Sequence, residues 1–324
     1  MDNGAVNIQG ASSSGIAASG AATLAVSNSR LSLTGLSGYG IDLADSAALT
    51  ADGLDITLSA PSSSAMSIRG GDVKARISNS TITVSDSYSG LELRRGDLIA
   101  DGLTITATGD TYGVRIGDGG AATAAFANSE INIERSRGML IFNAAVTLDN
   151  VNIVSSGRNA NALDINQAAS VTASGGHYTT YGTLADAVWL ASSDTHLDIH
   201  DAALATFGDA AHALNAQKGG AAAEGVTMST LGVESYGFYT ETDSSGRQLA
   251  IETHGDRARA PLAPAAAAWS YRTAPLIPGG SQPSALSSIH ARGLPPATLL
   301  LPRTAMRRRR SIQTSATRRS AIAP

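Results

Sequence analysis

The sequence contains no cysteine and few aromatic residues. Among 324 residues, 4% are Phe, Trp or Tyr, 15% are charged, and cysteine is absent. Without cysteine the chain can form neither a disulfide framework nor a thiolate metal site, and it has no cysteine nucleophile. Because aromatic rings supply much of the bulk of a large globular core, their scarcity favours a thinner and more repetitive fold.

Long apolar runs are missing as well. No window approaches the roughly 18 apolar residues that a membrane span requires, so we expect no membrane span in this chain. Met1 is followed by Asp2-Asn3-Gly4 and not by a basic and then an apolar segment, which is not typical of a signal peptide. As written, the chain is expected to remain in the cytoplasm.

The two signs of charge are distributed unevenly. All 27 acidic residues lie at or before Asp256 together with 12 of the 23 basic ones, so this part sums to −15. The last 68 residues hold 11 arginines, no acid and nine of the ten prolines, a sum of +11. We therefore predict one domain over residues 1–250 and a disordered Arg/Pro/Ala-rich tail over 251–324. Alternatively, the tail is an out-of-frame translation of a GC-rich gene, and the chain is the product of a disrupted gene.

A four-residue pattern recurs along the first part: a small residue, an apolar residue, a variable residue and another apolar residue. Its occurrences start 23 to 26 residues apart at Gly15-Ile16-Ala17-Ala18, Gly40-Ile41-Asp42-Leu43, Ala65-Met66-Ser67-Ile68, Gly90-Leu91-Glu92-Leu93, Gly113-Val114-Arg115-Ile116, Gly138-Met139-Leu140-Ile141, Ala162-Leu163-Asp164-Ile165, Ala187-Val188-Trp189-Leu190, Ala213-Leu214-Asn215-Ala216 and Gly237-Phe238-Tyr239-Thr240. Such even spacing indicates a stack of structural repeats.

A second pattern runs out of phase with the first: a turn dipeptide followed by alternating apolar and polar residues. Examples are Asn79-Ser80-Thr81-Ile82 and Asp101-Gly102-Leu103-Thr104-Ile105. Alternation bounded by Gly, Asn and Asp predicts short strands and turns. Short strands in repeats of this size cannot bury an apolar face alone, so successive repeats must stack. We predict an all-β fold, a right-handed parallel β-helix (solenoid) of about ten coils, with Ile41 and Leu43 inside.

These units resemble the passenger domains of pertactin-like autotransporters, Gram-negative surface proteins built on a right-handed parallel β-helix. The resemblance covers about residues 6 to 250; polysaccharide lyases and phage tailspikes share the architecture. It implies export through the outer membrane and a role at the cell surface, often adhesion or virulence. A complete member also has a signal peptide and a β-barrel translocator, so the resemblance implies that this chain is a fragment of a longer parent at the cell surface.

The tripeptide Arg95-Gly96-Asp97 is a candidate binding site, because some adhesion ligands present this sequence to integrins. It falls in the turn after Leu91-Glu92-Leu93, where exposure is plausible. A structural explanation competes with it, since a tight turn between coils selects Gly for positive φ and Asp for local hydrogen bonds.

The variable residues of the four-residue pattern form one outward ladder on the predicted β-helix. Its acids Asp42 and Glu92 lie two rungs apart, about 9.6 Å, near the upper limit for the carboxyl pair of an inverting glycosidase. The alternative is a solvated face on which Glu92 pairs with Arg115 of the next coil. Because every repeat has 23 to 26 residues, no room remains for an inserted catalytic loop, and we expect no enzymatic activity.

The same ladder carries Trp189 and Tyr239, which could stack on a sugar, with Asp164 and Asn215 supplying hydrogen bonds. Chance exposure of aromatic residues on a β surface is the alternative. The sequence thus predicts a non-catalytic passenger fragment, an adhesin or display stalk whose partner is a host receptor or a surface glycan. A β-helical polysaccharide-degrading enzyme is the second hypothesis.

No cofactor or metal is expected, because the histidines and acids do not form a ligand set. The Arg307–Arg310 run lacks aromatic interleaving, so no specific nucleic-acid partner is expected. Self-association is expected through unpaired strands at the first coil, around Val6-Asn7-Ile8, and the last, around Gly237-Phe238-Tyr239.

Overall fold

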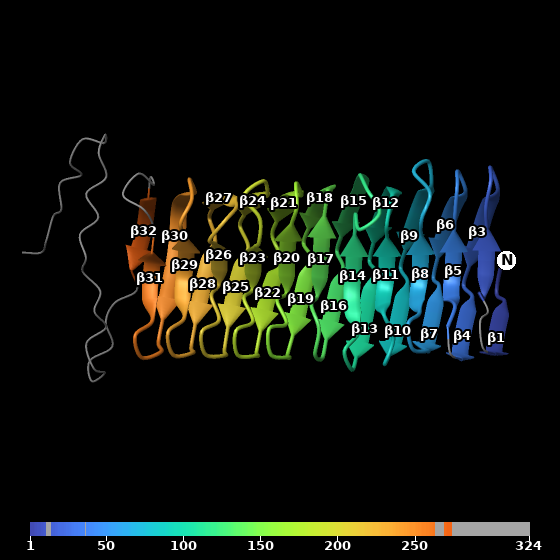
Figure 1. Cartoon of the computed structure of the whole chain (residues 1–324), viewed down its shortest axis with the longest axis horizontal. Coiled ribbons are helices and arrows are strands. Elements are labelled where there is room, and N and C mark those ends of the chain that lie inside the picture. Colours follow the sequence, from blue (N-terminus) through green and yellow to red (C-terminus); the bar gives the residue numbers. More distant parts are fainter. Residues whose placement is uncertain (11–13, 36, 263–268, 274–324) are drawn as a thin grey trace, which may run out of the picture. The chain divides into compact units, whose positions relative to one another are not determined.

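The protein forms a parallel β-solenoid of about ten coils, as predicted. The computed structural model describes residues 1–10, 14–35, 37–262 and 269–273, all of which belong to one compact unit, Met1–Ala291. The described residues contain strands and turns but no helix. Successive coils place their strands side by side, and every ladder is parallel (Figure 1). Short alternating strands in repeats of constant length therefore give the expected all-β architecture.

One eleven-stranded sheet, here called sheet 1, contains the four-residue pattern. Its strands, in ladder order, are β2 (Ile16–Ala18), β5 (Tyr39–Leu43), β8 (Ser64–Ile68), β11 (Ser89–Leu93), β14 (Tyr112–Ile116), β17 (Met139–Phe142), β20 (Leu163–Asn166), β23 (Val188–Leu190), β26 (Leu214–Ala216), β29 (Tyr236–Thr240) and β31 (Arg259–Leu262). Each coil contributes one strand, so equivalent residues of the pattern lie in register.

The other sheet consists of two ladders. Ladder 2 contains β3 (Thr23–Ser27), β6 (Ala48–Asp52), β9 (Lys74–Ser78), β12 (Gly96–Asp101), β15 (Ala122–Ala127), β18 (Ala144–Asp149), β21 (Ser170–Ser174), β24 (His196–His200), β27 (Gly220–Glu224), β30 (Ser245–Thr253) and β32 (Trp269–Thr273). Ladder 3 contains β1 (Ala5–Gly10), β4 (Arg30–Gly35), β7 (Asp55–Ser59), β10 (Thr81–Ser85), β13 (Thr104–Thr108), β16 (Glu130–Ile133), β19 (Asn152–Ser155), β22 (His177–Thr180), β25 (Ala203–Thr206) and β28 (Thr227–Thr230). The long strand β30 pairs with both β27 and β28 and so joins the two ladders.

Stacked aliphatic side chains fill the interior. Ile41 and Leu43 are fully buried, as the pattern predicts, and their register partners Met66 and Ile68 are buried with them. The fully buried aromatic residues of the described part are few, and Phe126 is among them. A tube one coil wide is filled by Ile, Leu, Val and Ala, which accounts for the low aromatic content.

The turn dipeptides of the second pattern hold one residue per coil in the left-handed region between ladders 2 and 3. Asn28, Gly53, Asn79 and Gly102 have φ of 45°, 62°, 46° and 65°, and the same position stays left-handed in later coils. Asn and Gly tolerate this conformation better than other residues. The Asn79 amide also donates to Asp52 of the preceding coil at 2.8 Å. Backbone conformation thus explains why Asn-Ser and Asp-Gly alternate along the sequence.

The strands continue past the predicted boundary between residues 250 and 251, which lies inside β30. β31 pairs with β29, with Phe238 opposite Pro261, and β32 pairs with β30. The coil around Gly237-Phe238-Tyr239 was predicted to be the last one, and this prediction is wrong. A change of charge and proline content marks the sequence there, but parallel backbone pairing depends on neither. The rest of the predicted tail lies outside the described residues.

Candidate functional site on the outer face of sheet 1

The outward ladder of the four-residue pattern, here called the central row, has the predicted register. Glu92 lies opposite Arg115, and Asp164 lies opposite Trp189. The predicted solvated face is wrong for half of this row, because Ser67, Glu92, Leu140, Asp164 and Asn215 are buried, with exposed fractions of 0%, 7%, 6%, 1% and 8%.

A second outward row, here called the flanking row, explains this burial. Its members stand three residues before those of the central row: Tyr39, Ser64, Ser89, Tyr112, Arg137, Asn161, Asp186, His212 and Tyr236. The register pairs Tyr39 with Ser64, and Ser89 with Ser64 and Tyr112, and backbone hydrogen bonds extend the row to Tyr236. The two rows pack beside each other and shield their polar groups from water.

In the first coils the acids of the central row are held by arginines. Asp42 receives two hydrogen bonds from Arg69, at 2.9 and 2.5 Å. Glu92 pairs with Arg94 at 4.0 Å and not with Arg115 as predicted, because Arg115 bonds Asp118 at 2.6 Å. Burial raises the pKa of the Glu92 carboxyl, and the charges of Arg94 and Arg115 oppose that shift.

Arg115 is packed between two aromatic rings. Its guanidinium carbon lies 4.7 Å from the ring centre of Tyr88 and 4.9 Å from that of Tyr112. These cation–π contacts, together with Asp118, hold the guanidinium where it forms no ion pair with Glu92. The sequence interpretation considered only neighbours within the central row and missed both rings.

Asp164 is the most completely enclosed acid of the central row. Arg137 donates its Nε–H to Oδ2, Asn161 donates to the same oxygen at 3.3 Å, and Asn166 donates to Oδ1 at 2.5 Å. Burial raises the pKa of this carboxyl, while the positive charge of Arg137 lowers it. Because Asp164 is 1% exposed and bound by all these donors, it stabilises the fold beneath the surface and is not open to solvent.

Asp186 of the flanking row forms a second polar network one coil further on. Its Oδ1 accepts the backbone N–H of His212 at 2.6 Å, and its Oδ2 accepts the Asn215 amide at 2.8 Å. Its own backbone N–H donates to Asn161 Oδ1 at 2.8 Å, which links the two networks. Burial raises the pKa of the Asp186 carboxyl to about 7 and lowers the pKa of the His212 imidazole to about 4.

Aromatic side chains lie beside the polar networks of Asp164 and Asp186. Trp189 and Tyr239 lie two rungs apart in the central row with Asn215 between them, as predicted, and both are half-buried. Tyr236 adds a ring 5.4 Å from Tyr239 and 5.0 Å from His212. The Tyr239 hydroxyl donates to Glu241, and this hydrogen bond together with burial raises the pKa of Tyr239 to about 12. The last coils thus carry rings and amides over fixed carboxylates, a combination suited to hydrogen-bonding and stacking with a polar ligand.

The tripeptide Arg95-Gly96-Asp97 lies only partly in the predicted turn, because Gly96 and Asp97 are the first two residues of strand β12. Arg95 and Asp97 are exposed, but Arg95 donates to the Gly119 carbonyl and Asp97 accepts from the Thr123 hydroxyl of the next coil. Gly96 has a φ of 99°, and a Cβ there would lie 2.7 Å from the Gly70 carbonyl oxygen. The fold therefore requires this glycine whether or not the tripeptide binds a partner.

Within the described ranges, no group of three or more His, Asp or Glu side chains is arranged to hold a metal ion. No helix in the same ranges is long and apolar enough to cross a membrane.

No protein-family model and no curated protein sequence matches this chain. Among solved structures it is similar to Vag8, a Bordetella autotransporter passenger, in the cryo-EM structure of the Vag8–C1 inhibitor complex. The two share 17% sequence identity with a TM-score of 0.58, over 81% of this chain and 74% of that one. This likeness shows the fold: an autotransporter-passenger-like parallel β-helix.

Proposed function

We propose that this chain is the non-catalytic passenger part of a Gram-negative surface autotransporter and acts as an adhesin or display stalk. The passenger-like fold supports this proposal, and so does the constant repeat length, which leaves no inserted loop for catalysis. Vag8, the similar protein, is found in a complex with C1 inhibitor, a precedent for partner binding on such a fold. The proposed location of the parent protein is the bacterial surface.

The observation that carries a binding role is the aromatic surface of the last coils. Trp189 and Tyr239 are half-buried and lie two rungs apart, and Asn215 between them is 8% exposed and held by buried Asp186. A ligand that meets aromatic rings on a surface without a deep cavity is best matched by a glycan chain, whose sugar faces are apolar and whose edges are hydroxyl-rich.

The acids of sheet 1 argue against the second hypothesis, a polysaccharide-degrading enzyme. Of the pair considered from the sequence, Asp42 is bound twice by Arg69, and Glu92 is 7% exposed and lies 4.0 Å from Arg94. A catalytic pair needs one carboxyl that can be protonated and another that reaches substrate or water. A reducing-end release assay on surface polysaccharides should accordingly give no activity above background.

A glycan array tests the binding proposal. We expect purified protein to bind a subset of glycans and Trp189→Ala to lose at least about fivefold in signal, because a stacked ring contributes on the order of 1 kcal/mol or more. Tyr88→Ala, an aromatic deletion just before strand β11 and beside Arg115, is the matched control and should bind like the parent. Equal binding by Trp189→Ala and parent, with unchanged circular dichroism, contradicts the proposed site.

A further inference from the structure

A row of exposed apolar side chains stands on turns beyond the candidate glycan surface. The turns between ladder 3 and sheet 1 repeat a Thr-apolar-Gly sequence in three successive coils: Thr180-Tyr181-Gly182, Thr206-Phe207-Gly208 and Thr230-Leu231-Gly232. The backbone N–H of Phe207 donates to the Thr180 carbonyl and that of Leu231 to the Thr206 carbonyl, both at 2.9 Å. Tyr181, Phe207 and Leu231 therefore lie in register and are here called the turn ridge.

The fold fixes the Gly of each turn, and it fixes the Thr of the first two turns. The Thr206 hydroxyl is buried and donates to the Ala211 carbonyl at 2.8 Å, which closes the turn from inside. A Cβ on Gly208 would lie 2.0 Å from the Gly182 carbonyl oxygen, and one on Gly232 would lie 1.8 Å from the Gly208 carbonyl oxygen. No such constraint applies to the middle residue.

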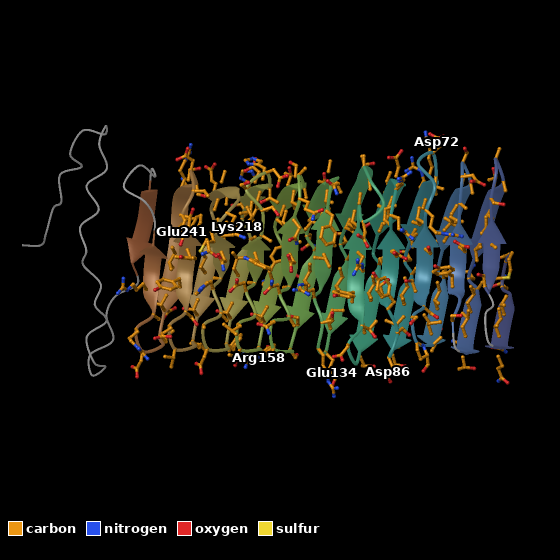
Figure 2. All side chains as sticks on the ribbon, in the orientation of Figure 1. Asp72, Asp86, Glu134, Arg158, Lys218 and Glu241 are labelled. Carbon is orange, nitrogen blue, oxygen red and sulfur yellow. The ribbon has the colours of Figure 1, made fainter. Side chains whose placement is uncertain are left out.

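Neighbouring coils demonstrate that freedom. The coils on either side have Ser156 and His254 in the middle position, in Ser155-Ser156-Gly157 and Thr253-His254-Gly255. Earlier coils place charged residues in the corresponding turns, where Figure 2 labels Asp86, Glu134 and Arg158. Apolar residues in three consecutive turns are thus not needed by the backbone.

The apolar side chains of the turn ridge are more exposed than most large apolar side chains of the described residues. Tyr181, Phe207 and Leu231 are 52%, 44% and 45% exposed, and Leu184 in the same row of turns is 41% exposed. Only Met1 and Ile99 are comparably exposed large apolar residues in the described ranges. A contiguous apolar surface of this kind on a polar protein is typical of an interaction site.

The geometry of the rings selects the kind of partner. The Tyr181 and Phe207 rings stack on each other, with centroids 4.8 Å apart and 18° between planes. Each ring covers one face of the other, which leaves fewer free ring faces for a sugar to stack on. Apolar side chains of a protein segment make no such demand.

Charge narrows the choice between a second copy and a different protein. Asp209, Glu234 and Asp256 are exposed in these turns, and Arg257 pairs with Glu234 at 2.7 Å. The turns at 207–210, 231–234 and 254–257 thus present three acids and one arginine, so two copies brought together along this edge would repel each other. We propose that the turn ridge docks a partner protein through an extended segment that alternates apolar with Lys or Arg residues.

The neighbouring face suits an extended segment. The outward residues that precede the ridge on ladder 3 are small and partly exposed: Thr179, Ala205 and Ser229. A segment laid across the coils would bury its apolar side chains against the ridge and place its basic ones near Asp209 and Asp256.

Synthetic peptides titrated against the full chain test this proposal. The probes are a fluorescent peptide of alternating Leu and Lys and a second of alternating Ser and Lys, with binding followed by anisotropy. We expect the Leu/Lys peptide to bind at least about tenfold more tightly than the Ser/Lys peptide, because only the former has apolar groups to bury.

The test variant is Phe207→Ser/Leu231→Ser, which introduces the serine that occurs naturally at position 156. The control is Ile99→Ser, because Ile99 on ladder 2 is about equally exposed. The double variant should lose the preference for Leu/Lys, whereas Ile99→Ser should keep it, and both should melt within a few degrees of the parent. An unchanged preference in the double variant overturns the proposal.

Sedimentation velocity gives a second test. If the parent forms a dimer and the double variant does not, the ridge binds a second copy of this chain and the proposal is overturned. Failure of the glycan array leaves this outcome unaffected, since the ridge contains none of the residues of that site.

Discussion

The Asp186 carboxylate accepts the backbone N–H of His212 at 2.6 Å, and burial shifts the pKa values of the two side chains in opposite directions. The folded-state pKa of Asp186 is raised from 3.8 to about 7, so its contribution to stability is full below pH 3.8 and is lost as pH rises toward 7. The pKa of His212 is lowered from 6.5 to about 4, so its contribution is full above 6.5 and is lost as pH falls toward 4.

When either side chain is removed, the pH dependence of the free energy of unfolding should therefore show the contribution of the other. Relative to the parent, Asp186→Asn should gain stability as pH rises, and His212→Gln should lose it, each by about 1.4 kcal/mol per pH unit. Urea unfolding at about pH 4.5, 5.5 and 6.5 measures these differences. Parallel stability profiles for the parent and both variants would mean that neither pKa is shifted in the folded state.

The second prediction concerns the ion pair between Arg137 and Asp164. Asp164 is 1% exposed, so Arg137→Ala leaves a buried carboxylate with amide donors only and should cost about 3 kcal/mol. Arg30→Ala is the matched control, because the Arg30–Asp55 pair is 72% and 39% exposed, and it should cost less than about 1 kcal/mol.

Chemical denaturation of both variants gives the comparison, and adding Asp164→Asn to Arg137→Ala should recover part of the loss. Equal losses for the two arginine variants would show that burial of Asp164 contributes little.

The sequence was sufficient to predict the solenoid because two of its determinants repeat by residue type. The inward pair, such as Ile41 and Leu43, is always apolar or small, and the left-handed turn position is nearly always Asn, Asp or Gly. Both reflect constraints that each coil must satisfy separately: a narrow interior and a positive φ.

The flanking row of sheet 1 could not be predicted in this way. Its members range from Tyr39 through Arg137 to Asp186 and His212, so no residue type repeats, although the spacing from the central row is constant. The residue type that fits each position depends on its neighbours in adjacent coils. Asp186, for example, accepts a hydrogen bond from Asn215. Looking three residues before each central position for groups that complement it would have found these pairs.

The third prediction concerns the glycines of the turns beside the turn ridge. Gly208→Ala should lose at least about 2 kcal/mol, because the new Cβ would lie 2.0 Å from the Gly182 carbonyl oxygen, and the backbone would have to move. Gly71→Ala is the control, since a Cβ there meets nothing within 4 Å, and it should change stability by no more than about 0.5 kcal/mol. Thermal unfolding of the two variants checks this, and a Gly208→Ala protein as stable as the parent would show that adjacent coils can separate at this edge.

The last prediction concerns Arg95-Gly96-Asp97. Gly96→Ala cannot separate binding from folding, because Gly96 has positive φ and its Cβ would approach the Gly70 and Val73 carbonyl oxygens at 2.7 and 2.8 Å. Asp97→Glu keeps the charge and leaves Gly96 intact, so it is the cleaner test. Since Arg95 and Asp97 are each bonded to the next coil, we expect Asp97→Glu to support cell attachment as well as the parent does. An attachment assay on integrin-expressing cells measures this; a loss that a soluble peptide of the same tripeptide reproduces in the parent would instead assign integrin binding to this turn.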